Sequence, residues 1–564
     1  MLGAFVGTRS HVAAWQDEAT PTAVASREGL EIVVVGGESS VPGRPIRGGS
    51  LRLDRPGAAL GDFNPSALAQ DQQISLSYLE PLVRPDPVTM RPMPWLASRW
   101  EWFEQGLELE LTIRNGVVWH DGTSFTAADA AFSFSVYRED LESVFTGLFA
   151  LVTDVSATSD SSLRVTFSER DAMWLFNAAT LPVFSRHQYA DFWSDQPEGA
   201  RSLSGFDWGA SLPVGTGPWQ VQAWTEQSVQ FGRFNRYWRS PAWFDSLEVG
   251  VDTGARNRLS SWTDDRSDMI WPLPAREINE LKDGPGRLYV VPAASVMFAA
   301  FNFANPAQPN GSVWSDLRVR QAVSMAIDRE RYANEVFGGY MRWSAAGTVA
   351  QPWANDSDLT NPSYNPQAAA ALLGEAEWID YTGDGQRVDP AGNPFAIVAI
   401  MRRDSRPELA AILARVARDL AAVGITLTIE ALTPDDFDDR WIVQRDYDLI
   451  AYAYDELPGF TDVDLYGSAW DIRHNPVGWN PGGYANAEAD AAIDEYLSAQ
   501  SITRQREALL KLQKAANDDL FGLWFGFPND LVLVADHIDG FKPNINWQTA
   551  DTAGVWESRR PNQT

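Results

Sequence analysis

The chain of 564 residues carries 75 Asp or Glu against 45 Lys or Arg, which gives a formal net charge of −30 at neutral pH. A field of this sign repels polyanions, so nucleic acid and anionic membrane surfaces are excluded as favourable partners. The charge is interpreted as an ordinary solvated acidic surface, with attraction of cationic ligands as the alternative. The absence of cysteine excludes disulfides, thiolate metal sites and thiol catalysis. The length exceeds one ordinary domain, and no run of about 18 apolar residues predicts a membrane-spanning helix.

The N-terminal segment differs in composition from the rest. Val12-Ala13-Ala14 places small residues where signal peptidase prefers them, so residues 1–14 are interpreted as the tail of a truncated signal peptide, with a disordered N-terminus as the alternative. Residues 16–47 are rich in Glu, Thr, Pro, Ser and Gly, apart from the apolar run Ile32–Val35. We therefore expect residues 1–47 to be a signal remnant followed by a disordered tether.

Strand and turn patterns come next along the chain. Residues 51–54 alternate apolar and polar side chains, which predicts a short strand. Residues 107–119 predict a hairpin that turns at Asn115-Gly116. Thr126 and Asp129 have the spacing of a capping box, so a helix is expected to begin directly after Thr126.

Strand and helix patterns alternate in the second half. Residues 407–423 place apolar side chains at helical spacing, and Gly424 is expected to end that helix. Residues 425–430 then alternate as a strand, a further helix begins at Pro434, and residues 448–454 predict the next strand. This order is typical of an α/β lobe with crossover connections.

Patterns that would indicate catalysis or metal binding are missing from the sequence. The five histidines have no metal-ligand spacing, and neither His-Glu-x-x-His nor a complete Gly-x-Ser-x-Gly occurs. His120 and Asp121, which follow the predicted hairpin, are assigned a structural role. We therefore expect no catalytic residue, no metal and no cofactor.

Two loops carry partial motifs. Gly215-Thr216-Gly217 resembles the start of a dinucleotide loop, but Gln220 replaces the third glycine and a strand pattern follows, so a tight turn is favoured over a phosphate site. Residues 380–385 read DYTGDG and match part of a calcium loop, but Ala391 stands where a bidentate glutamate is required. A polar turn is favoured over a calcium site there.

Four longer segments occur in a fixed order and together resemble a known family. They are WLASRWEW at 95–102, LTIRNGVVWHDGTSFTAAD at 111–129, PVGTGPW at 213–219 and SDLRVRQAVSMAID at 315–328. In this order they are similar to the family 5 extracellular solute-binding proteins of ABC importers, the oligopeptide- and dipeptide-binding proteins. Shorter matches at 61–65, 233–238 and 480–490 extend the resemblance over about residues 48–556.

The resemblance implies the fold and its division. It implies an α/β, periplasmic-binding-protein-like fold (type II, cluster C), with two hinged lobes and an additional inserted lobe. Lobe I is expected to be discontinuous, with the inserted lobe II and then lobe III between its segments. The expected segments are 48–85, 206–296 and 525–564 for lobe I, 86–205 for lobe II and 297–524 for lobe III.

The resemblance also implies ligand-binding residues. In the family an aromatic residue and, three residues later, an Asp lie at the end of a strand, and Tyr452 and Asp455 fit that spacing. Such an Asp pairs with the α-ammonium of a peptide through a charge-assisted hydrogen bond. A loop-capping role for Asp455 remains the alternative. Phe63 and Asn64, in an early turn, and Trp524, near the return into lobe I, are further candidates for ligand contact.

The predicted function is the binding component of an ABC importer, which captures a short peptide between two lobes and delivers it to permease subunits in the membrane. An oligosaccharide receptor of the same fold is the first alternative, because the 24 tryptophans suit stacking on sugar rings. A glycoside hydrolase is the remote one. The protein is expected to be a monomer, extracytoplasmic and exported by its signal peptide.

Overall fold

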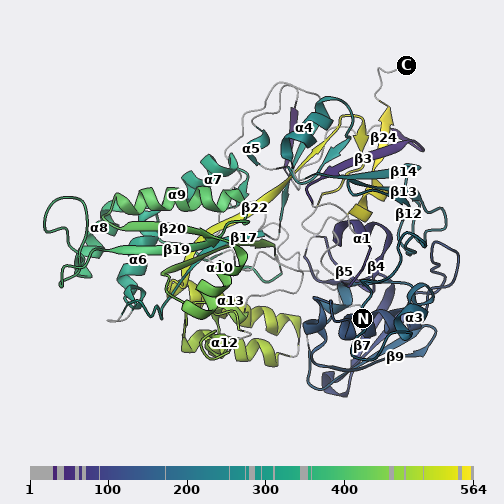
Figure 1. The fold of residues 1–564 in the computed structure, drawn as a ribbon, viewed down its shortest axis with the longest axis horizontal. Helices are drawn as coiled ribbons and strands as arrows, with labels where there is room; N and C mark the ends of the chain where they lie inside the picture. The colour runs from purple at the N-terminus through teal and green to yellow at the C-terminus, as the bar shows by residue number, and fades with distance from the viewer. Residues whose placement is uncertain are drawn as a thin grey trace, which may run out of the picture.

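The strand β22 (Gly522–Val534) joins two halves of a 13-stranded sheet, and in Figure 1 it runs from the helices α6–α13 to the strands around β3. Its first half pairs antiparallel with β17 (Ser295–Phe301), and its second half pairs with β15 (Met269–Ile270) and β16 (Gly286–Pro292). The computed structural model describes residues 30–34, 44–57, 63–66, 72–87, 89–171, 173–252, 254–273, 275–278, 286–293, 295–308, 312–342, 353–356, 358–455, 463–475, 478–499, 501–543 and 549–559.

One half of this sheet is built around β3 (Ser50–Arg55), which confirms the short strand predicted from residues 51–54. β3 is parallel to β14 (Ser246–Val251) on one side and to β15 on the other. The other elements of this half are β12 (Trp219–Trp224), β13 (Ser228–Arg233), β1 (Leu30–Val34), α4 (Ala255–Thr263) and α5 (Ala275–Ile278).

In the other half, the strand order is β17, β21 (Leu449–Asp455), β19 (Ala396–Arg402) and β20 (Thr426–Leu432). β19 is parallel to both β20 and β21, as crossover connections require. The other elements are β18 (Met341–Arg342), α6 (Leu317–Ala326), α7 (Arg329–Phe337), α8 (Pro366–Glu375), α9 (Pro407–Ala421), α10 (Pro434–Asp438), α11 (Val463–Tyr466), α12 (Ala487–Ser498) and α13 (Ile502–Asp518).

A four-stranded antiparallel sheet stands apart from the large one, at the lower right in Figure 1. Its order is β7, β8, β10, β9, and α2 packs against β9 and β10. The elements are β7 (Ala97–Phe103), β8 (Glu108–Ile113), β9 (Val152–Ser159), β10 (Ser162–Phe167), α2 (Ala127–Glu139) and α3 (Arg186–Ser194). The smaller elements are α1 (Gln72–Tyr78), β2 (Arg44–Ile46), β4 (Glu80–Pro81), β5 (Val83–Pro85), β6 (Pro92–Pro94), β11 (Pro182–Val183), β23 (Ile538–Asp539) and β24 (Trp556–Arg559).

The strand β17 divides the second half into two cores, because successive side chains of a strand point to opposite faces. Met297, Ala299 and Phe301 pack in the core with α6, α7 and α9. Phe298 and Ala300 pack in the core with α12 and α13. β17 is buried on both faces, as its uninterrupted apolar sequence requires.

Several local predictions can be compared with the structure. The capping box of Thr126 and Asp129 is present, and the helix beginning at Pro434 is confirmed as α10. The return strand at 117–119 is wrong: β8 pairs with β7 and β10 instead. Residues 117–125 fold back on themselves, with the Phe125 amide donating to the Val117 carbonyl at 3.1 Å. Among the described helices, none has the length and apolar character needed to span a bilayer.

Candidate functional site

Three aromatic side chains from adjacent strands form a row on the sheet face that α12 and α13 cover. Phe298 of β17 lies opposite Tyr452 of β21 and opposite Trp524 of β22 in the strand register. The Phe298 ring centroid is 5.6 Å from that of Tyr452 and 4.8 Å from that of Trp524. The structure therefore brings two predicted ligand residues to the two sides of Phe298, which was not predicted. We call Tyr452, Phe298 and Trp524 the aromatic row.

The Tyr452 hydroxyl is buried and has no hydrogen-bond partner among the described residues. Phe437 and Trp441 flank the ring of Tyr452, each with a centroid 6.0 Å away. Burial raises the pKa of Tyr452 well above its ordinary value of 10.0, so the phenol keeps its proton at neutral pH. A buried hydroxyl without a partner has lost its hydrogen bonds to water, and a ligand oxygen at this position would restore one.

Two tryptophans continue the aromatic contacts toward solvent. Trp441, which touches Tyr452, has its ring centroid 5.5 Å from that of Trp479. Trp479 is 49% exposed, so one of its faces is open to solvent. Rigid aromatic faces bind apolar side chains and ring systems with little loss of rotamer freedom.

Trp524 lies at the buried end of the row, with 2% of its surface exposed. Its backbone carbonyl accepts a hydrogen bond of 2.7 Å from Nε of Arg329, a residue on α7. Burial lowers the pKa of Arg329 to about 10, so the guanidinium remains charged at neutral pH. Ser324 accepts the other hydrogen bonds of Arg329, through its carbonyl at 2.9 Å and its hydroxyl at 3.0 Å. Arg329 thus fixes the backbone of β22 behind the Trp524 ring.

The other predicted ligand residues lie elsewhere. Asp455 ends β21, where its backbone pairs with Ser295, and its side chain lies outside the described part of the chain. Phe63 is buried in a different core, with its ring centroid 5.0 Å from that of Trp224. Asn64 is also buried, and its Oδ1 accepts hydrogen bonds from the Ser66 amide at 3.0 Å and the Ser66 hydroxyl at 2.8 Å. Phe63 and Asn64 are therefore not part of the aromatic row.

A buried carboxylate that was not predicted accepts hydrogen bonds from three of the motif segments. Glu80, on β4, is 3% exposed, and its Oε1 accepts hydrogen bonds of 2.8 Å from Trp95 Nε1 and from the Tyr237 hydroxyl. Its Oε2 accepts hydrogen bonds of 2.9 Å from the Thr216 hydroxyl and from Trp238 Nε1. Burial raises the pKa of Glu80, and these four donors oppose that shift. We call Glu80 and its four donors the Glu80 cluster.

A sequence model of the family described as bacterial extracellular solute-binding proteins, family 5 Middle, matches residues 91–469, which is more than half of the chain. The chain belongs to the family 5 bacterial extracellular solute-binding proteins. It is therefore a solute-binding protein that works outside the cytoplasm, as the family description states.

Known proteins with similar sequences or folds agree with this membership. The chain is 27% identical over 338 residues to the probable ABC transporter periplasmic-binding protein SapA of Escherichia coli (strain K12). The matched region covers 55% of this chain and 59% of that protein. The match thus spans little more than half of that relative. The oligopeptide-binding protein AppA from Bacillus subtilis, in complex with a nonapeptide, has a TM-score of 0.69 at 19% identity, over 92% of this chain and 100% of that one. NikA from Brucella suis, in complex with Fe(III)-EDTA, has a TM-score of 0.75 at 18% identity, over 90% of this chain and 100% of that one. These likenesses confirm the predicted α/β, periplasmic-binding-protein-like fold class.

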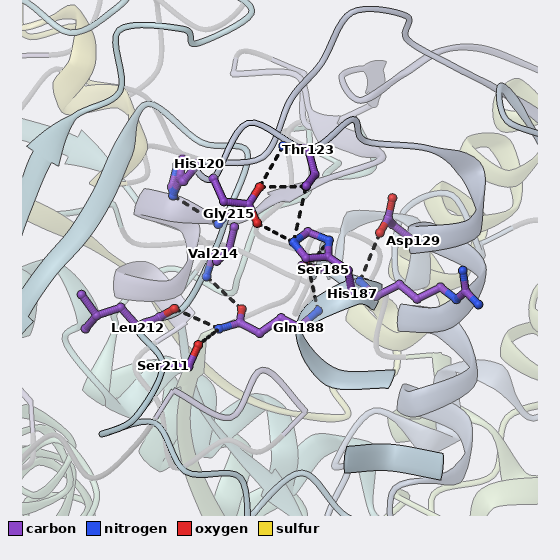
Figure 2. Close-up of polar contacts among 12 residues, drawn as sticks. His120, Thr123, Asp129, Ser185, His187, Gln188, Ser211, Leu212, Val214 and Gly215 are labelled. Carbon is purple, nitrogen blue, oxygen red and sulfur yellow. Dashed lines mark hydrogen bonds and ion pairs between the residues drawn. The ribbon is translucent and has the colours of Figure 1, made fainter. Parts of the chain in front are cut away.

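In this family 5 protein His120 and His187 belong to a polar network (Figure 2). His187 lies 2.9 Å from the Ser185 hydroxyl through Nδ1 and 2.6 Å from Asp121 Oδ2 through Nε2, an order that resembles a catalytic triad. Ser185, however, is fully buried and caps α3, since its hydroxyl accepts a hydrogen bond of 3.2 Å from the Gln188 amide. The geometry therefore gives this serine a structural task.

The same network ties the loop after β8 to the turn at 213–219. Nδ1 of His120 accepts a hydrogen bond of 3.2 Å from the Gly215 amide, and its Nε2 lies 3.1 Å from the Gly217 carbonyl. Burial lowers the pKa of His120 to about 4, so its ring is neutral at physiological pH and can fill both roles. Gln188 holds the same turn, because its Oε1 accepts a hydrogen bond of 3.0 Å from the Val214 amide.

The loop at 380–385 uses its first carboxylate internally. Oδ1 of Asp380 accepts a hydrogen bond of 2.7 Å from the Gly383 amide, and Oδ2 accepts one of 2.9 Å from the Gly385 amide. These bonds lower the pKa of Asp380 and hold the segment as a polar turn. Within the described ranges, no group of three or more His, Asp or Glu is arranged to hold a metal ion.

Proposed function

We propose that this protein is the substrate-binding component of an ABC importer, which captures a short peptide and delivers it to the permease subunits. The observation that carries the proposal is the buried, unpartnered Tyr452 hydroxyl, which lies beside Phe298 on the strand that leads to Asp455. The name of SapA as an ABC transporter component and the nonapeptide bound by AppA support the same reading.

The proposed lobes are those expected from the sequence, with hinges in the two crossings between lobes I and III. The boundary at 296/297 falls inside β17 and the boundary at 524/525 falls inside β22, so both crossings are continuous strands. Phe176 of lobe II packs against Trp353 of lobe III with ring centroids 5.1 Å apart, in the same hydrophobic core as Phe298 and Trp524. A ligand held between lobes I and III would favour the closed arrangement and shift the population toward it.

The proposed ligand contacts are the five predicted ones, joined by Phe298. Asp455 pairs with the α-ammonium of the peptide, and the Tyr452 hydroxyl donates to a backbone carbonyl. The three remaining residues are buried in the structure, so their proposed role is to shape the walls of the ligand site: Phe63, Asn64 and Trp524. Extended peptides are held largely through the main chain, so side-chain discrimination at these positions is expected to be weak.

The proposed role is binding and release without chemistry. The ligand leaves unchanged, the protein works as an exported monomer, and the permease complex supplies the energy of transport. The burial of Ser185 under its capping bond supports this reading against hydrolysis. Recovery of the intact ligand by mass spectrometry after long incubation tests it.

The deciding experiment is a thermal-shift and calorimetric comparison of peptides of two to nine residues with cello- and xylo-oligosaccharides. Peptides are expected to raise the melting temperature by mass action, and sugars are not. Asp455→Asn is expected to weaken peptide binding about tenfold or more, since charged hydrogen bonds contribute about 1.5–3 kcal/mol. The matched control is Asp494→Asn on the exposed face of α12, which should bind like the wild type. Binding of sugars alone would overturn the peptide assignment.

A further inference from the structure

A polar cavity of about 410 Å³ lies at the carboxyl ends of the parallel strands β3 and β14, away from the aromatic row. The turn between β12 and β13 forms one wall with Glu226, and α4 forms another with Arg258 and Ser261. Carboxyl ends of parallel strands are common ligand positions in α/β folds, because loops and helix ends converge there. None of the predicted ligand residues lines this cavity.

Arg258 is the least satisfied group of the cavity wall. It is only 2% exposed, and one of its amino groups donates to the Asp252 carbonyl at 2.5 Å. Its Nε is buried and has no hydrogen-bond partner among the described residues, and no ion pair within that part of the chain involves Arg258. Burial lowers the pKa of this guanidinium and outweighs the attraction that Asp252, Asp54 and Glu277 exert on it at longer range. A carboxylate in direct contact would fit its planar fork and reach the unpartnered Nε. The Arg258 side of the cavity therefore calls for an anionic ligand group.

The wall formed by β3, which touches α4, carries negative charge. Asp54 on β3 accepts hydrogen bonds from Ser261 and Ser267, and burial raises its pKa. The Asp54 carboxylate lies against Gly250 of β14. A Cβ on Gly250 would come within 2.3 Å of Asp54 Oδ1, so only glycine leaves room for this carboxylate. Glu226 adds a second, exposed carboxylate. A cationic ligand group would satisfy this wall.

The third acid of the cavity is already occupied. Oδ1 of Asp252 accepts a hydrogen bond of 2.5 Å from the Gly254 amide, and Oδ2 accepts one of 3.0 Å from Asn257. The acids of the cavity also do not converge as metal ligands do, since the described residues contain no such group. The cation that the wall accepts is therefore an organic ammonium rather than a divalent metal.

We propose that this cavity binds a free α-amino acid as a dipolar ion, with its carboxylate on Arg258 and its ammonium between Asp54 and Glu226. An α-amino acid carries a carboxylate and an ammonium on the same carbon, so it can pair with the cationic wall at Arg258 and with the anionic wall at Asp54 and Glu226 at once. The volume lies within the range of about 300–1,000 Å³ that is usual for small-molecule sites and leaves room for a side chain. The site is separate from the proposed peptide site and does not depend on what that site binds.

The test is titration calorimetry of the full chain with alanine, glutamine and lysine at up to about 10 mM, next to the single-charge probes alanine amide and propionate. At least one amino acid is expected to bind, and the single-charge probes are expected to bind at least about tenfold more weakly. No binding by any of the three amino acids, or equal binding by alanine amide, would overturn the proposal.

Two variants and a control place the ligand. Arg258→Met keeps the aliphatic stem and is expected to abolish binding. Glu226→Gln changes an exposed side chain, so the fold is retained and the affinity is expected to fall several-fold even if Arg258→Met fails to fold. Glu198→Gln removes the same charge from an exposed position of the inserted segment and should bind like the wild type. Unchanged affinity in Glu226→Gln would contradict the proposed ammonium position.

Competition separates this inference from the proposed function. A saturating short peptide is expected to leave amino-acid binding unchanged, because the two sites share no residue. Displacement of the amino acid by the peptide would place it in the peptide site and overturn the second site. Failure of every peptide to bind, with amino-acid binding intact, would instead contradict only the proposed peptide receptor.

Discussion

Replacing Glu80 by glutamine is expected to destabilise the protein through a single indole group. Each oxygen of the Glu80 carboxylate receives one indole N–H and one hydroxyl: Trp95 and Tyr237 on Oε1, Trp238 and Thr216 on Oε2. Glutamine keeps one oxygen and replaces the other with an NH₂ donor. A hydroxyl facing that NH₂ can rotate and accept from it, whereas an indole N–H can only donate. One indole N–H therefore loses its partner in either amide orientation, that of the buried Trp95 or that of the partly buried Trp238.

The magnitude follows from that geometry. A buried donor left unsatisfied costs about 1–3 kcal/mol, and the two hydrogen bonds to the retained oxygen weaken because their acceptor is no longer charged. Removing a buried carboxylate relieves its desolvation, which is also the cause of its raised pKa, and this relief opposes the loss. We expect a net destabilisation of about 2–3 kcal/mol for Glu80→Gln, below the ~3–5 kcal/mol of a broken buried ion pair.

Urea unfolding followed by tryptophan fluorescence measures the effect, with Glu198→Gln as the control of equal charge. The pKa of Glu80 is raised above its ordinary value of 4.5, so the folded state binds this proton more tightly than the unfolded chain does. The stabilisation that Glu80 contributes is fully present at pH values below its ordinary pKa of 4.5. It is lost as the pH rises through the raised pKa of the folded state. The stability gap between the wild type and Glu80→Gln should therefore narrow as the pH rises. A variant as stable as the wild type at all pH values would refute the reasoning.

Three further predictions concern the fold and its closure. The pKa of His120 falls from 6.5 to about 4 in the folded state, so stability should decline by about 3 kcal/mol as pH falls between these values, and unfolding of His120→Gln should lack this decline. Gly215→Ala should prevent folding, measured by circular dichroism, because its Cβ would lie 1.8 Å from the Tyr78 carbonyl oxygen. Phe176→Ala should weaken the packing against Trp353 and enlarge the radius of gyration measured by X-ray scattering in the ligand-free protein. An unchanged radius would show that this contact does not hold the proposed lobes II and III together.

Local signals in the sequence predicted local structure well. The capping box at Thr126 and Asp129, and the proline at the start of α10, act within one helical turn, so their spacing is sufficient. The return strand predicted after Asn115-Gly116 was wrong because a turn signal is equally local and does not decide which strands pair. The turn is real, but β8 finds better partners in β7 and β10, which lie far away in the sequence.

The site depends on pairings that a single sequence does not display. Phe298 meets Tyr452 and Trp524 because β17 pairs with strands that begin more than 150 residues later in the chain. The apolar run at 295–301 carries no signal of which strands lie beside it. Glu80 was missed because it has no motif of its own, although three of the motifs supply its donors. Long-range register and buried polar networks therefore had to come from the structure.

The motifs and the proposed ligand face perform different tasks, and this difference has a consequence for ligand choice. Trp95, Thr216 and Trp238 lie in motif segments and all point their donors at one buried carboxylate, so their replacement is expected to damage the fold. Phe298 and Tyr452 lie outside the motif segments, on strands whose backbones are held by their neighbours. Changes in the aromatic row can therefore alter the ligand while the motifs, and with them the fold, stay intact.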